Sequence, residues 1–231
     1  MRIPTMVALA AAAMLAGWTA TTVAVAQPAC AELGGIVDPA HICQVHTSNA
    51  TYRLDFAFPA DYPDQQALAA YLSQTKDGFV NVSQMPGSRD QPYVLDVRGT
   101  QYSSGGILPR TQSLEIELYQ DIGGAHPQTW YKTFNYNLVT KAPITFDTLF
   151  KPGTRPADVI FPIVQRELQK QSGVETAVPS SAGLDPTHYQ NFVITDDAVI
   201  FFFGQGELLA EAAGVTQASV PRAALASILA I

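Results

Sequence analysis

One pair of residues in this sequence matches a known catalytic spacing. Ser73 and Lys76 stand as in the Ser-x-x-Lys of penicillin-recognising enzymes, where the lysine helps to activate the serine. The partner motifs of those enzymes are missing, and Ser73 falls on the polar side of an expected helix. The Gly-x-Ser-x-Gly turn, the His-Glu-x-x-His zinc motif and glycine-rich phosphate loops are also absent. We therefore expect no catalytic residue, no cofactor, no metal and no enzymatic activity.

A pair of carboxylates is the alternative source of catalysis. Glycoside hydrolysis needs only two acids a few ångströms apart, and the chain carries 20 Asp and Glu residues. A cell-wall-directed hydrolase built on such a pair stays open, although the sequence gives no reason to choose Glu115 over Glu167. A cavity holding two carboxylates would favour this alternative, whereas a flat surface rimmed by loops would favour binding.

Among the four histidines, His126 stands in the most unusual backbone. It follows Gly123 and Gly124 in a Gly-Gly-Ala-His-Pro turn, where glycine permits conformations that other residues avoid. Loops on a rigid sheet are where recognition concentrates, so Gly123, Gly124 and His126 form the candidate recognition loop, with the loops near Gly105 and Gly183 beside it. The alternative is that the imidazole fixes the hairpin through a hydrogen bond to a neighbouring strand.

The two cysteines, Cys30 and Cys43, predict a disulfide. An even count of closely spaced thiols in an exported chain is more often a bridge than a metal or redox pair. The alternative is a metal site in which His41 and His46 join Cys43. The two histidines are five positions apart, a spacing that shares neither a helix face nor a strand face.

The first 26 residues have the pattern of a signal peptide. Arg2 supplies the positive charge, residues 6–18 are almost wholly apolar, and Ala24 and Ala26 are the small residues that a signal peptidase needs. We expect cleavage after Ala26 and a secreted, extracellular chain. The apolar run is shorter than the about 20 residues of a membrane anchor, although a retained anchor is the alternative.

The composition indicates a packed protein that does not bind nucleic acid. Hydrophobic residues make up 47% and charged residues 14%, which excludes intrinsic disorder. Lys and Arg total 13 against 20 acidic residues, a formal net charge of −7. Affinity for nucleic acid comes from clustered cations, so we exclude that partner.

The elements that must position these residues are mainly strands. Residues 61–80 and 154–171 have helical periodicity, although Pro162 fits a helix interior poorly, and a short helix follows Pro221. Runs of strands with two substantial helices predict an α+β fold: a mixed, mostly antiparallel sheet with two main helices packed on it and a short C-terminal helix. Alternating or apolar runs predict strands over residues 51–58, 93–102, 114–120, 129–138, 143–150, 191–194, 198–203 and 215–220.

Residues 114–138 should form a long antiparallel hairpin. A boundary near residue 144 would divide the mature chain into an N-terminal half, residues 27–143, with the disulfide loop and the hairpin, and a C-terminal half, residues 144–231, packed into the same globule.

Several strings in the same order resemble a known family. They are Tyr62-Pro63-Asp64-Gln65, Gly123-Gly124-Ala125-His126-Pro127, Phe161-Pro162-Ile163-Val164-Gln165, Gly183-Leu184-Asp185-Pro186, Tyr189-Gln190-Asn191-Phe192, and Phe201-Phe202-Phe203 before Gly206-Glu207-Leu208-Leu209. With the cysteine pair, they are similar to the mycobacterial secreted immunogenic protein (MPT/MPB sixty-four antigen) family. The resemblance implies a secreted α+β protein that is recognised by host immunity and has no established enzymatic activity.

The C-terminal half has a second resemblance. Residues 144–224 are similar to the extracellular domain of the RsiV anti-sigma factor, a domain of unknown function whose best-understood member binds lysozyme. The similarity implies an extracellular or host protein as partner, a lysozyme-type protein included. An acidic chain would also attract a basic partner such as lysozyme.

Overall fold

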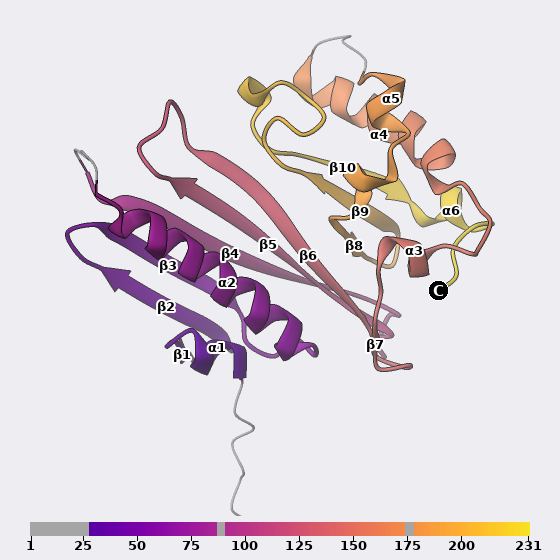
Figure 1. Cartoon of the computed structure of the whole chain (residues 1–231). Helices are drawn as coiled ribbons and strands as arrows, with labels where there is room; N and C mark the ends of the chain where they lie inside the picture. Colours follow the sequence, from indigo (N-terminus) through magenta and orange to yellow (C-terminus); the bar gives the residue numbers. More distant parts are fainter. Residues whose placement is uncertain (1–27, 87–90, 174–177) are drawn as a thin grey trace, which may run out of the picture.

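A computed structural model describes residues 28–86, 91–173 and 178–231 (Figure 1). The expected signal peptide and its cleavage after Ala26 lie outside these residues. Seven strands form one sheet in the order β1-β2-β3-β4-β5-β6-β7, and three form a second sheet in the order β10-β9-β8. The strands are β1 (Ile36–Val37), β2 (Ile42–Ser48), β3 (Tyr52–Pro59), β4 (Tyr93–Ser104), β5 (Thr111–Asp121), β6 (Gln128–Asn137), β7 (Ala142–Pro143), β8 (Phe192–Ile194), β9 (Ala198–Phe203) and β10 (Thr216–Pro221).

Two helices are long. In α2 (Gln65–Gln84), the Asp64 carboxylate caps the first turn by accepting the N–H of Ala67 at 3.1 Å. In α4 (Pro156–Ser172), Pro156 occupies the first turn and Gly173 ends the helix with a φ of 66°. The short helices are α1 (Pro28–Glu32), α3 (Phe146–Leu149), α5 (Ser180–Gly183), α6 (Arg222–Leu225), η1 (Pro186–Tyr189) and η2 (Glu211–Ala213).

The helix α2 connects the only parallel pair among the described strands, β3 and β4. A parallel pair needs a crossover connection, and Figure 1 shows α2 lying across one face of the large sheet. That face buries a core to which α2 contributes Leu68, Leu72 and Phe79.

Strand β5 presents two chemically different faces. Leu114, Ile116 and Leu118 point into the core under α2. Because side chains alternate along a strand, Ser113 and Glu115 lie on the opposite face, where both are buried. The C-terminal half of the chain packs on this second face.

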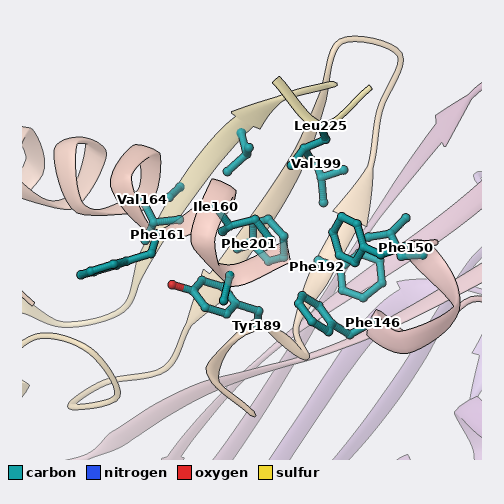
Figure 2. Close-up of a cluster of buried hydrophobic side chains, with 14 of the residues drawn as sticks. Phe146, Phe150, Ile160, Phe161, Val164, Tyr189, Phe192, Val199, Phe201 and Leu225 are labelled. Carbon is teal, nitrogen blue, oxygen red and sulfur yellow. The ribbon is translucent and has the colours of Figure 1, made fainter. Parts of the chain in front are cut away.

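A second core fills the C-terminal half (Figure 2). The ring of Tyr189 stacks against Phe146 at 6.2 Å and meets Phe201 edge-on at 5.4 Å between ring centroids. Its hydroxyl donates a 2.6 Å hydrogen bond to the carbonyl of Gly183. Gly183 itself has no room for a side chain, because a Cβ would stand 2.0 Å from the ring of Phe161.

The expected α+β class is confirmed. The strands divide between two sheets, with α2 on the first and α4 against β10 of the second. The long hairpin is β5–β6, and Pro162 lies inside α4. Two local predictions differ: residues 143–150 hold α3 after a two-residue strand, and β2 was not predicted at all.

The predicted disulfide between Cys30 and Cys43 is present, with an S–S distance of 2.03 Å. It removes the alternative metal site, because the Cys43 sulfur is bonded to Cys30 and is no longer a thiolate ligand. Among the described residues, no group of three His, Cys, Asp or Glu side chains could hold a metal ion. No described helix has the length and hydrophobicity that crossing a membrane takes.

Candidate functional site

A histidine and a carboxylate meet between η1 and the loop that follows β9. His188 Nδ1 lies 3.5 Å from Glu207 Oε1, and the two side chains are 27% and 26% exposed. The other carboxylate oxygen of Glu207 accepts the N–H of Gly204 at 2.7 Å, which fixes the carboxylate. In hydrolytic triads a carboxylate hydrogen-bonded to Nδ1 orients the ring and leaves Nε2 for proton transfer. The 3.5 Å separation here is longer than a hydrogen bond, and catalytic contacts of this kind tighten when substrate binds.

A second histidine–carboxylate pair joins the two halves of the chain. His126 Nε2 lies 2.9 Å from Glu211 Oε2, so the β5–β6 turn meets η2. The other ring nitrogen, Nδ1, lies 3.3 Å from the carbonyl of Pro127 and 3.3 Å from Gln128 Nε2. Both nitrogens of His126 are therefore engaged, in contrast to His188.

The rest of the predicted recognition loop is exposed and tightly turned. Gly123 has a φ of 72° and donates its N–H to the Asp121 carboxylate at 2.9 Å. Gly124 is exposed beside it. The loop thus presents backbone to solvent while His126 contacts the C-terminal half.

An apolar cavity is lined by the segment that lies between Glu207 and Glu211 in the sequence. Its volume is about 710 Å³, and it opens between the end of α4 and the loop from β9 to β10. Glu207 immediately precedes the lining segment 208–210, and Glu211 immediately follows it. The apolar residues among the described lining are Val178, Pro179, Leu208, Leu209, Ala210, Ala212, Ala213 and Val215.

Two glutamates share a face of β5, away from this cavity. Glu115 is 6% exposed, and its burial raises its pKa to about 7, partly opposed by a hydrogen bond from Thr100. Glu117, two positions along, accepts the Tyr131 hydroxyl at 3.2 Å and raises the Glu115 pKa further. Neither the apolar cavity nor a smaller one of about 200 Å³ beside Arg110 and Asp196 is lined by these carboxylates.

The other residues considered from the sequence are not brought together. Lys76 Nζ donates to the carbonyl of Leu33 at 3.3 Å, which directs the amine to the backbone of the turn that follows α1. Glu167 forms a surface ion pair with Lys170 at 2.8 Å. No sequence pattern predicted the His188–Glu207 pair, because the two residues belong to different elements that only the tertiary fold joins.

Comparison with known proteins places the chain among mycobacterial relatives. It is 57% identical over 218 residues to a Mycobacterium tuberculosis protein named Esterase Rv3036c, covering 94% of this chain and 95% of that protein. It is 46% identical over 202 residues to the immunogenic protein MPB64 of Mycobacterium bovis, covering 87% of this chain and 88% of the relative. The chain belongs to the MPB64 family.

Residues 147–223 of this chain match a domain family described as a protein of unknown function (DUF3298). A crystal structure of a DUF3298 family protein from Pseudomonas aeruginosa PAO1 has a TM-score of 0.56 at 12% identity, covering 84% of this chain and 96% of that one. At that identity the likeness concerns the fold alone. The family assignment made from the sequence is confirmed.

One expectation is wrong. The sequence led us to expect a chain without enzymatic activity, because no catalytic motif was found. A relative that is 57% identical over 94% of the chain is named an esterase, which points to an enzyme. A motif search fails here because a base and the carboxylate that orients it need only be close in space.

Proposed function

We propose that the chain is a carboxyl ester hydrolase in which His188 acts as general base. The observation that carries the proposal is the His188–Glu207 pair, in which Glu207 directly precedes Leu208, a residue that lines the apolar cavity. The esterase name of the 57% identical relative supports the reaction class. Of the two histidine–glutamate pairs, only the one at His188 leaves a ring nitrogen without a hydrogen-bond partner among the described residues.

The chemistry needs one proton acceptor that later becomes a donor. His188 Nε2 takes a proton from the attacking hydroxyl, which adds to the ester carbonyl. The Glu207 carboxylate stabilises the imidazolium so formed. When the tetrahedral intermediate collapses, the imidazolium returns the proton to the departing alkoxide. The net reaction converts an ester and water into a carboxylic acid and an alcohol.

The geometry favours water as the attacking group. Within the described parts of the chain, no serine or threonine hydroxyl is hydrogen-bonded to His188. A fluorophosphonate probe, which labels nucleophilic serines, should therefore leave the active protein unmodified. Labelling of a serine would replace water as the nucleophile and would keep His188 as the base.

The test compares matched variants in hydrolysis of para-nitrophenyl acetate. We expect His188→Gln to lower kcat/KM by about 100-fold or more, since general base catalysis contributes about that much. Glu207→Gln should lower it by about 10-fold or more, because the ring loses its orienting charge. His126→Gln removes the other histidine and should stay within about twofold of the parent. Equal losses in both histidine variants would contradict the proposal.

Hydrolysis by an acid pair is the second candidate, on the strength of the raised pKa of Glu115. A general acid must touch its substrate, yet Glu115 is 6% exposed and lines neither cavity. The His188–Glu207 pair is therefore preferred. Loss of activity in Glu115→Gln with retention in His188→Gln would reverse this preference.

We also propose that the protein works outside the cell as a soluble antigen-like protein. The disulfide supports export, because such bridges persist in oxidising compartments, and the relatives named immunogenic proteins support the antigenic character. Intact-mass analysis of culture medium should find a chain that begins at Gln27. A host-protein partner is a separate proposal, for which a pull-down from host extracellular fluid is the test.

A further inference from the structure

The apolar cavity has the size and the walls of a ligand site. Its volume of about 710 Å³ falls within the range of about 300–1,000 Å³ that small-molecule sites occupy. The cavity is open to solvent, and small-molecule sites are mostly apolar clefts of this kind. Its floor is firm, because Leu208 and Val178 belong to the buried core of the C-terminal half.

We propose that this cavity binds the linear acyl chain of the ester. The inference rests on the proposed function and adds the substrate class, an ester of a medium-length fatty acid. An ester of this kind has one polar end and one apolar tail. The base His188 lies 3.5 Å from the Glu207 carboxylate. Leu208, which follows Glu207 in the sequence, lines the apolar cavity.

The polar groups of the cavity are too few to favour a polar ligand. Gln171, Ser172 and Thr216 are the polar side chains among its lining residues, and the Gln171 amide already donates to the carbonyl of Gln217 at 2.7 Å. Among the described residues that line the cavity, none carries a charged side chain. A chain of methylene groups matches such walls, since each buried methylene strengthens binding by about fourfold.

Binding can be measured apart from catalysis with neutral alcohols. Hexanol, octanol and decanol carry the same methylene chain, cannot be hydrolysed, and avoid repulsion by Glu207 and Glu211. Calorimetry on the full chain should show the dissociation constant falling by about fourfold for each added methylene. A dissociation constant that does not change with chain length would overturn the inference.

Filling the cavity gives the second arm of the test. Ala213 lines the cavity and is exposed at its rim, so Ala213→Trp adds bulk without removing a core side chain. We expect decanol affinity to fall by about 10-fold or more and KM for para-nitrophenyl decanoate to rise similarly. Ile36→Trp, at a 78% exposed position of β1, is the matched control and should change neither. If Ala213→Trp fails to fold, Ala212→Trp serves in its place.

The two proposals fail in different ways. Decanol binding that Ala213→Trp abolishes, without hydrolysis of any ester, would keep the acyl site and overturn the esterase proposal. Ester hydrolysis that is lost in His188→Gln but has no dependence on acyl length or on Ala213→Trp would keep the esterase and overturn the acyl site.

Discussion

At the scale of single residues, the surroundings of Glu115 disfavour the ionised form of its carboxyl group. Its side chain lies on the face of β5 that the C-terminal half covers, and burial there raises its pKa from the ordinary 4.5 to about 7. The neighbouring carboxylate of Glu117 acts in the same direction. The folded chain therefore prefers the protonated acid, whereas the unfolded chain loses that proton near pH 4.5.

The sign of this shift fixes how stability depends on pH. Below pH 4.5 both states are protonated and Glu115 has no effect. Between pH 4.5 and about 7 Glu115 is ionised in the unfolded state but still protonated in the folded state. The free energy of unfolding therefore falls as pH rises, by up to about 3 kcal/mol. Glu115→Gln keeps the shape and removes the titration.

We expect Glu115→Gln to be more stable than the parent at pH 8, by about 1–3 kcal/mol, and less dependent on pH. Urea denaturation across the pH range measures both effects. Glu32→Gln, at an exposed position of α1, should reproduce the parent curve. A Glu115→Gln variant whose curve runs parallel to the parent would refute the argument.

At the scale of elements, the second sheet docks onto side chains of the first. Edge strands carry unpaired backbone groups that must find partners when buried. The N–H of Phe192 donates to Thr133 Oγ1 at 2.9 Å, and the carbonyl of Phe192 accepts Asn135 Nδ2 at 2.8 Å. The N–H of Ile194 donates to Ser113 Oγ at 3.1 Å. Polar residues on β5 and β6 thus replace the missing neighbour of β8.

Ser113 is the centre of this arrangement, since its hydroxyl also donates to Asn135 Oδ1 at 2.6 Å. Ser113→Ala would leave the N–H of Ile194 and that amide oxygen buried without partners. We expect the free energy of unfolding to fall by about 2–3 kcal/mol. Ser48→Ala, on an exposed strand position, should cost under about 0.5 kcal/mol. If guanidinium denaturation finds equally small losses of stability in Ser113→Ala and Ser48→Ala, then β8 does not depend on these hydrogen bonds.

At the scale of the whole molecule, two cores carry the fold. One lies under α2 and includes the buried disulfide, and the other lies between α4 and the second sheet. Contacts between the halves join β8 to the large sheet, His126 to Glu211, and Asp196 to the N–H groups of Gly105 and Gly106 at 2.7 and 3.3 Å. Because these contacts join the two halves, we expect the disulfide to stabilise the whole fold and not only the segment between Cys30 and Cys43.

Replacing both cysteines, Cys30→Ala with Cys43→Ala, should lower the free energy of unfolding by about 3 kcal/mol, as the loss of a loop closed over 13 residues implies. The free energy of unfolding of the parent should fall by a similar amount under reductant, whereas that of the double variant should not change. Thermal unfolding followed by circular dichroism measures both. A reductant-insensitive parent would contradict the contribution assigned to this bridge.

Local pattern determined much of this protein. The two-residue period of β3 to β6 and the helical period of α2 and α4 follow from which side chains must be buried, and that information is local. The disulfide was predicted from two closely spaced cysteines in a chain that we expected to be exported. The terminal β10–α6 pair was likewise marked by alternation and by Pro221.

The tertiary structure decided the rest. Strand β2 escaped prediction because only Cys43 and Val45 are buried apolar residues at alternate positions, which is too short a pattern to mark a strand. Its pairing with β3 is what establishes the strand. The division into two sheets depends on Ser113, Thr133 and Asn135, whose roles appear only when β8 lies against them. The pairing of His188 with Glu207 arises because η1 and the loop after β9 meet in space, and proximity of that kind leaves no periodic pattern in the sequence.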